Sequence, residues 1–150
     1  MNYKTIIASQ QAFFNSNITK DLSFRLTQLK KMKRLLKENE GLLFEAIYKD
    51  FKKSELETFI TELGQVYHEI DLLLKKLKRW CKPKRVSNGM VNFPGKSFIM
   101  PEPLGVVLVI GAWNYPYALS LTPLVSAIGA GNTVILKPSE IPSHTAKAMA

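Results

Sequence analysis

The sequence holds a single cysteine, Cys81, among its 150 residues. An internal disulfide is therefore excluded, and a reducing compartment is the expected one. No apolar run approaches the roughly 18 residues that a membrane-spanning helix requires, and the first residues lack the apolar core of a signal peptide. These absences together predict a cytoplasmic protein.

Metal-ligand spacings and the usual dinucleotide-binding turn are also missing. The two histidines, His68 and His144, have no partners at the separations that zinc sites use. The glycines Gly111, Gly129 and Gly131 do not follow the GxGxxG pattern. The sequence thus predicts no metal site and offers no standard phosphate-binding loop.

Acidic residues are scarce, and the formal net charge is +9. Residues 1–85 hold 18 Lys and Arg against 10 Asp and Glu, so nearly all of the excess lies there. Such an asymmetry can indicate an acidic partner such as nucleic acid, or simply a solvated helical surface. The basic cluster at residues 75–79 falls in the last turns of an expected helix, where cations favour the negative end of the helix dipole. Nucleic-acid binding would therefore rest on charge alone, and no nucleic-acid partner is expected.

Apolar residues in the first half recur at helical spacing. The expected helices cover residues 6–14, 22–36, 39–47 and 55–80. The last of them carries one continuous apolar stripe, which predicts that this whole face is buried. Ser54 and Glu57 form the pattern of a capping box at its start, and Asn39 is the expected cap of the preceding helix.

A change of composition marks residues 82–103, which are rich in proline, glycine and short alternating apolar pieces. Turn signals at Asn88-Gly89 and Pro94-Gly95 predict a loop and a hairpin, with Met90 to Phe93 and Phe98 to Met100 as its apolar pieces. This segment separates the helical half of the chain from residues 104–150.

The remaining residues read as strand, helix and strand. Leu104 to Ile110 is apolar on both faces, as in a parallel strand covered by helices on both sides. A helix is expected from Pro116 to Gly129, kinked or split at Pro123, and Thr133 to Leu136 is a second buried strand. Ser143 is the expected cap of a further helix. The fold class is therefore α/β, and because two strands do not make a stable parallel sheet, further strands are expected from elsewhere.

Polar or aromatic side chains follow both strands where each strand ends: Trp113, Asn114 and Tyr115 after the first, and Lys137, Ser139 and Glu140 after the second. Ligands on such sheets bind beyond the carboxyl ends of the strands, so one cleft is expected. An asparagine there offers an amide donor for an oxyanion, and a lysine with a glutamate can bond ribose hydroxyls. A turn-forming asparagine and a solvated strand end are the competing interpretations.

A family resemblance lies in residues 102–140, EPLGVVLVIGAWNYPYALSLTPLVSAIGAGNTVILKPSE. This segment resembles the cofactor-side segment of the aldehyde dehydrogenase superfamily. The stretches KDFKKSELET and LKRWCKP resemble its class 3 branch, which acts on fatty and medium-chain aldehydes. The resemblance implies the N-terminal portion of such an enzyme: helices over residues 1–81, a linker and oligomerisation hairpin over 82–103, and the first βαβ unit of a Rossmann-like NAD(P)-binding domain over 104–150.

The resemblance also implies roles for individual residues. Asn114 becomes the oxyanion donor that polarises the aldehyde oxygen, and Tyr115 and Leu119 line the aldehyde tunnel. The expected cofactor is NAD or NADP, held by the following residues: Ile110, Gly111, Ala112 and Trp113 through the backbone beside the nicotinamide half, and Lys137, Ser139 and Glu140 at the adenosine ribose.

Full members of the superfamily are considerably longer, and their catalytic cysteine and general-base glutamate lie beyond residue 150. Cys81 cannot replace that cysteine, because it lies far in sequence from the strand ends. The chain alone is therefore expected to be inactive. The parent is expected to be a homo-oligomer, a dimer, with membrane association left open. The alternative is a noncatalytic module that associates with itself through the hairpin and the exposed sheet edge.

Overall fold

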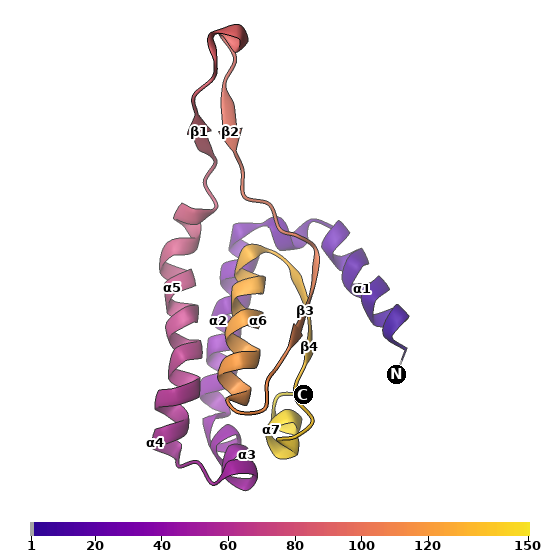
Figure 1. Cartoon of the computed structure of the whole chain (residues 1–150), viewed down its shortest axis with the longest axis vertical. Helices are drawn as coiled ribbons and strands as arrows, with labels where there is room; N and C mark the ends of the chain where they lie inside the picture. The colour runs from indigo at the N-terminus through magenta and orange to yellow at the C-terminus, as the bar shows by residue number, and fades with distance from the viewer. Residues whose placement is uncertain (1) are drawn as a thin grey trace.

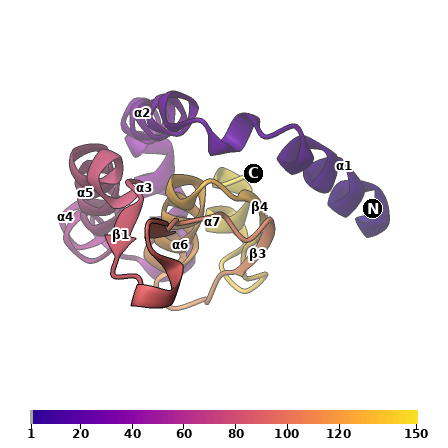
Figure 2. The same cartoon turned by 90° about the horizontal axis from the view of Figure 1, so that it is seen from above.

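The computed structural model describes residues 2–150. Helices pack on one face of a short parallel sheet, the first helix lies against the other face, and a hairpin arm projects from one end (Figures 1 and 2). This is a mixed α/β architecture, as the sequence predicts. Within the described residues, every helix falls short of the length or the apolar character needed to cross a membrane.

The first half of the chain is helical. Its elements are α1 (Tyr3–Asn15), the short 3-10 helix η1 (Ile18–Lys20), α2 (Leu22–Glu38), α3 (Glu40–Phe51), α4 (Glu55–Thr58), the π-helical turn η2 (Phe59–Leu63) and α5 (Gly64–Trp80). All of the helices expected from periodicity are present. A core of large aliphatic side chains lies between α2, α3, α5 and α6, including Leu29, Ile47, Ile70 and Val125.

One of the expected helix caps forms in part, and another does not form. The Ser54 hydroxyl accepts a hydrogen bond from the Glu57 backbone N–H at 3.1 Å, which is one half of a capping box. Asn39 precedes α3, but its side chain does not cap that helix. Its amide instead donates to the Leu35 carbonyl at 2.8 Å, so it serves the end of α2. Because an asparagine between two helices can satisfy either one, spacing alone did not decide between them.

The expected continuous stripe over residues 55–80 is wrong at its start. Phe59 and Ile60 are exposed, whereas Thr58 and Glu62 are completely buried. These residues lie in or directly before the π-helical turn η2, whose i to i+5 bonds depart from the 3.6-residue period. The helix therefore turns a carboxylate toward the protein interior.

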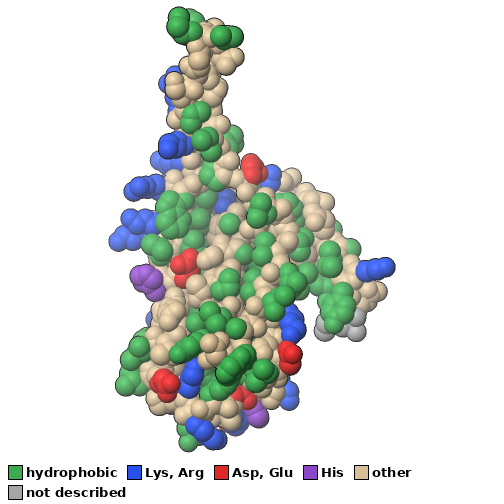
Figure 3. Space-filling model, viewed as in Figure 1, with side chains coloured by type: hydrophobic (Ala, Val, Ile, Leu, Met, Phe, Trp, Pro, Cys, Tyr) green, Lys and Arg blue, Asp and Glu red, His purple; other side chains and the backbone are tan. Residues whose placement is uncertain are grey.

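The arm consists of β1 (Lys84–Val86) and β2 (Ser97–Ile99), which pair antiparallel. The expected hairpin is therefore present, and its first apolar piece lies at the tip, where Met90–Asn92 forms the 3-10 turn η3. Met90 and Val91 at the tip are almost fully exposed, and hydrophobic side chains gather at this end of the molecule (Figure 3).

The sheet contains β3 (Val106–Ile110) and β4 (Thr133–Lys137), joined by α6 (Pro116–Ala130), and α7 (Ser143–Ala148) comes after β4. The two strands are parallel, as expected for a βαβ unit. Of the expected kink or split of α6 at Pro123, the split does not occur, since α6 remains one helix. Its packing between α5 and the sheet supports the turn in which the proline lacks an N–H.

One face of the sheet is less covered than the sequence suggests. Val109 is buried, but Leu108 and Ile110 are exposed by 58% and 67%. Within residues 2–150 this face is covered by α1, with an apolar groove of about 980 Å³ between that helix and the strands. The expectation that both faces of β3 are buried is therefore wrong for residues 2–150, because the chain supplies a single short helix on this side.

Candidate functional site at the carboxyl edge of the sheet

The segments that come after the two strands lie next to each other. Ile110 and Lys137 are paired at the ends of β3 and β4. The Gly111 backbone N–H continues the pairing with a hydrogen bond of 2.9 Å to the Lys137 carbonyl. The residues after both strands therefore leave one edge of the sheet side by side, where parallel sheets bind their ligands.

Gly111 fixes the path of the chain out of β3. A Cβ atom at this position would lie 2.1 Å from the Ser120 hydroxyl oxygen and 3.6 Å from the Pro138 Cα atom. Only glycine allows the segment to cross this closely over α6. The close crossing places residues 112–115 above the start of α6.

The aromatic and apolar residues around Asn114 remain accessible. Trp113, Tyr115 and Leu119 are 52%, 42% and 44% exposed, and Asn114 is also exposed. Tyr115 stands just before α6, and its carbonyl accepts from the Leu119 N–H at 2.9 Å, so the two residues lie one helical turn apart. The ring of Trp113 lies 6.5 Å from that of Phe51, between ring centroids. Exposed apolar or aromatic side chains therefore come directly before Asn114, directly after it and one turn later.

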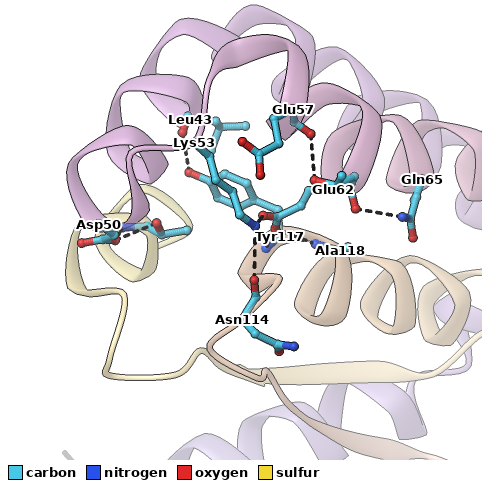
Figure 4. Close-up of polar contacts among 11 residues, drawn as sticks. Leu43, Asp50, Lys53, Glu57, Glu62, Gln65, Asn114, Tyr117 and Ala118 are labelled. Atoms are coloured by element: carbon cyan, nitrogen blue, oxygen red, sulfur yellow. Dashed lines mark hydrogen bonds and ion pairs between the residues drawn. The ribbon is translucent and has the colours of Figure 1, made fainter.

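Lys53, which lies just after α3, holds the backbone of Asn114. Its ammonium donates to the Asn114 carbonyl at 3.2 Å and to a Glu62 carboxylate oxygen at 2.7 Å. It also lies 4.2 Å from the centre of the Tyr115 ring, a favourable cation–π position. Figure 4 shows the Asn114 carboxamide pointing away from this contact. The backbone of Asn114 is thus fixed while its amide group faces outward.

Glu62 connects Lys53 to the first turn of α6. Its second carboxylate oxygen accepts from the backbone N–H groups of Tyr117 at 2.8 Å and Ala118 at 3.4 Å. A carboxylate at this end of a helix satisfies free N–H groups and complements the helix dipole. Burial, together with the negative charge of Glu62, raises the pKa of Tyr117, whose hydroxyl donates to the Leu43 carbonyl. Tyr117 therefore serves the packing of α6 as a neutral phenol.

The residues after β4 present an exposed ion pair. The Lys137 ammonium and a Glu140 carboxylate oxygen are 2.6 Å apart, and the side chains are 55% and 79% exposed. This hydrogen bond from Lys137 holds the pKa of Glu140 below its ordinary value. Ser139 between them is almost buried, and its hydroxyl oxygen accepts from the Ile141 N–H at 3.4 Å. A carboxylate acceptor and an ammonium donor side by side fit the hydroxyl groups of a ribose.

Asp50, the penultimate residue of α3, anchors the start of α7. One of its oxygens accepts from the Thr145 N–H at 2.8 Å and from the Thr145 hydroxyl at 2.7 Å, and the other lies 2.8 Å from the His144 Nδ1. The expectation that Ser143 caps α7 is wrong: Ser143 is already inside the helix and Asp50 provides the acceptor. Local spacing could not reveal a cap that lies more than 90 residues away.

Three residues that hold the segments after β3 and β4 were not predicted as site residues: Asp50, Lys53 and Glu62. They come from the helical half of the chain, so no motif near the strands points to them. Only Glu62 could have been found from the sequence, because it stands four residues before the buried Val66 and so on the same face of the helix. A carboxylate on an apolar stripe requires a partner. Among residues 2–150, no three potential ligands lie close enough to hold a metal ion.

The model of the aldehyde dehydrogenase family matches residues 2–150 of the chain. Over 137 residues the chain is 45% identical to 4,4'-diaponeurosporen-aldehyde dehydrogenase of Staphylococcus aureus, which covers 91% of the chain and 30% of that protein. It is 44% identical over 141 residues to aldehyde dehydrogenase family 3 member A2 of Macaca fascicularis, which covers 94% of the chain and 29% of that protein. The chain thus spans about 30% of the length of these curated relatives.

Solved structures of other enzymes share the fold of this chain. The substrate-bound state of Staphylococcus aureus AldH superposes with a TM-score of 0.95 at 43% identity, over 99% of this chain and 33% of that one. An NADP-dependent enzyme of E. coli superposes with a TM-score of 0.81 at 20% identity, over 95% of this chain and 29% of that one. The second likeness concerns the fold alone.

Proposed function

Because the chain belongs to the aldehyde dehydrogenase family, we propose that it is the N-terminal part of an enzyme that oxidises aldehydes to carboxylic acids with NAD or NADP. The net reaction converts an aldehyde, water and NAD(P)⁺ into a carboxylate, NAD(P)H and two protons. The observation that carries the proposal is the placement of Asn114 at the carboxyl edge of the sheet, with its backbone bound by Lys53 and its carboxamide free to act (Figure 4).

The proposed role of Asn114 is to donate a hydrogen bond to the aldehyde oxygen. When a thiolate adds to the carbonyl carbon, the negative charge moves to this oxygen, and a fixed amide donor stabilises it. Donors of this kind contribute about 100-fold to 1,000-fold in rate. Because the donor is held before the substrate arrives, no reorganisation is needed during the addition.

The nucleophile of this reaction must come from outside the 150 residues. Cys81 comes directly after α5, at the opposite end of that helix from Glu62 and Asn114. A helix of 17 residues is roughly 25 Å long at about 1.5 Å per residue. The Cys81 sulfur instead accepts from the Arg25 guanidinium at 3.3 Å. We therefore expect the 150-residue chain alone to be inactive toward aldehydes.

The proposed cofactor-binding residues are those that leave the two strands. Glu140 would accept from, and Lys137 would donate to, the ribose hydroxyls on the adenosine side, with Ser139 beside them. The backbone from Ile110 to Trp113 would run along the nicotinamide half, and NAD(P)⁺, when bound, supplies the hydride acceptor. The exposed Lys137–Glu140 pair supports this assignment, since both groups can exchange their mutual bond for bonds to hydroxyls.

Tyr115 and Leu119 are the proposed lining of the aldehyde tunnel. Both residues are partly exposed and lie one turn apart, and Tyr115 directly follows Asn114, whose carboxamide would meet the aldehyde oxygen. An apolar surface beside a single polar donor suits a substrate with one carbonyl group on a hydrocarbon chain. The proposed substrate class is therefore an apolar aldehyde.

The arm formed by β1 and β2 is the proposed contact between subunits of a homodimer. Its tip exposes Met90, Val91 and Phe93 by 95%, 98% and 84%. Apolar side chains this exposed favour association. The same tip also suits a noncatalytic module that associates with itself, which is the second candidate function. A reading frame that runs on past Ala150 to a cysteine-containing segment would remove this second candidate, and a stop codon there would favour it.

The proposal is tested in the protein encoded by the complete reading frame that contains this chain. Asn114→Ala is expected to lower the turnover of a medium-chain aldehyde by about 100-fold to 1,000-fold, with little change in the KM for the cofactor. Asn15→Ala, which replaces an exposed asparagine at the end of α1, is the matched control. An unchanged turnover number in Asn114→Ala would remove the oxyanion role.

A further inference from the structure

We propose that Lys53 and Glu62 act as a positioning pair for Asn114, holding its carboxamide in the direction needed for the reaction. This inference rests on the proposed function of Asn114. We call this pair the 53–62 clamp. It comes from the segment that joins α3 to α4 and from the π-helical turn η2, so it belongs to the helical half of the chain and not to the sheet.

The clamp holds both ends of the segment that carries Asn114. The Lys53 ammonium binds the Asn114 carbonyl at 3.2 Å, where the segment passes above α6. The Glu62 carboxylate binds the N–H groups of Tyr117 and Ala118, where the segment becomes helical. The two anchors are joined to each other at 2.7 Å, so one ion pair fixes residues 114–118 (Figure 4).

Burial makes this connection stiff. The side chain of Lys53 is 12% exposed and that of Glu62 is not exposed at all. The ammonium is further enclosed by the rings of Tyr115 at 4.2 Å and Phe51 at 5.6 Å. A charge in such surroundings has little access to water as a substitute partner, so movement of either group away from its partner is unfavourable.

Burying this ion pair costs desolvation free energy, which a purely structural role would not require. A buried ion pair can often be replaced by uncharged groups of similar shape without loss of stability. What an uncharged replacement would not reproduce is the directed bond to the Asn114 carbonyl. A displacement of about 1 Å at a catalytic group can lower the rate by about 100-fold. The clamp therefore acts on the direction of the carboxamide more than on the stability of the fold.

A double variant separates these two effects. Lys53→Met alone would leave Glu62 buried and unpaired, and could unfold the protein. Lys53→Met with Glu62→Gln removes both charges, while the glutamine oxygen still accepts from the α6 backbone. The bond to the Asn114 carbonyl is then lost, together with the ion pair itself and the contacts of the ammonium with the Tyr115 and Phe51 rings. The matched control is Lys49→Met with Glu45→Gln, which removes an exposed ion pair of 2.6 Å on α3.

Kinetics in the protein encoded by the complete reading frame give the first test. The clamp double variant is expected to lower turnover by about 10-fold to 100-fold, with an unchanged KM for the cofactor and an unchanged melting temperature. In an Asn114→Ala background it should cause no further loss, because a positioning pair acts only through the group it positions. A loss that adds fully to that of Asn114→Ala would overturn the clamp.

Hydrogen exchange on the 150-residue chain gives a second test that does not depend on activity. Exchange of backbone amides in residues 111–118 should be faster in the clamp double variant and unchanged in the control variant. Unchanged exchange in both would overturn the clamp. Faster exchange combined with full activity of Asn114→Ala would support the clamp and remove the oxyanion role. Failure of the clamp and failure of the proposed function are therefore distinguishable.

Discussion

Asp50 at the end of α3 binds Thr145 at the start of α7 through two hydrogen bonds to one carboxylate oxygen, at 2.8 Å from the backbone N–H and at 2.7 Å from the hydroxyl. The two residues are 95 positions apart in the chain. The first turn of α7, which comes just after the Lys137–Glu140 segment, is therefore capped by a residue of the helical half.

Replacing this acceptor should destabilise the fold. Asp50→Ala leaves the Thr145 N–H and hydroxyl without a charged partner, and we expect a loss of about 2 kcal/mol in the free energy of unfolding. Denaturant unfolding followed by circular dichroism measures it. Asp71→Ala is the control, since Asp71 is an exposed partner of Lys33 and should change stability by less than about 0.5 kcal/mol. Equal losses in the two variants would contradict the anchoring role.

The same carboxylate makes stability depend on pH. Burial raises the pKa of Asp50, but the hydrogen bonds from Thr145 and His144 outweigh it and hold the pKa below the ordinary value of 3.8. A lowered pKa in the folded state adds stability above the unfolded-state value, and that contribution is lost as the pH falls through the folded-state value. Below pH 3.8, unfolding titrations should therefore show a steeper loss for the wild type than for Asp50→Asn. Parallel curves of stability against pH for the two proteins would argue against a lowered pKa of Asp50 in the folded state.

A methyl group at residue 111 should be tolerated only when Ser120 is shortened. Gly111→Ala places a Cβ atom 2.1 Å from the Ser120 hydroxyl oxygen, and we expect a destabilisation of about 2 kcal/mol from overpacking. Ser120→Ala alone should be nearly neutral, because this hydroxyl is buried without a hydrogen-bond partner. The double variant should recover most of the loss in thermal melts. Additive losses would show that the strain lies elsewhere.

Removing the ammonium of Lys137 at the end of β4 should weaken cofactor binding without changing the rate of the chemical step. In the protein encoded by the complete reading frame, Lys137→Ala is expected to raise the KM for NAD(P)⁺ by about tenfold, the effect of losing one hydrogen bond, with turnover nearly unchanged. Steady-state kinetics with NAD and NADP measure this effect and show which cofactor is used. Lys147→Ala on α7 is the exposed control. A lowered turnover with constant KM would contradict a binding role.

Polar substitutions at the tip of the arm should weaken self-association. Met90→Ser combined with Val91→Ser removes the two most exposed apolar side chains of η3 and should shift the protein toward smaller species in size-exclusion chromatography with light scattering. Asn92→Ser, on the same turn, is the matched control. An unchanged mass for the double variant would exclude the tip as the main contact.

Local patterns in the sequence were sufficient for most elements of the fold. The helices α1, α2, α3 and α5 reflect apolar residues at steps of three and four. The strands β3 and β4 reflect short β-branched runs between turn residues, and their polar ends identified the edge that carries Asn114 and Lys137. In each case neighbours within a few positions determine the conformation, so a single sequence is enough.

The wrong expectations share a different physical origin. The buried Glu62 of the π-helical turn binds the backbone of α6, and the cap on α7 is provided by Asp50. The family resemblance singled out Asn114, but it did not point to Lys53, which binds its backbone. Contacts between residues about 50 to 95 positions apart leave no periodic trace in the sequence.

The groups that hold the carboxyl edge of the sheet precede it in the chain, and this order matters during synthesis. Asp50, Lys53 and Glu62 leave the ribosome before β3 and β4, and domains form from the N-terminal side as the chain emerges. We therefore expect the helices to be assembled first, so that the loop with Asn114 and the start of α7 settle onto a surface that already exists. Pulse-labelled exchange during refolding should show the amides of 143–145 protected after those of α5. If so, the geometry of the candidate site is imposed on the second half of the polypeptide by the half translated first.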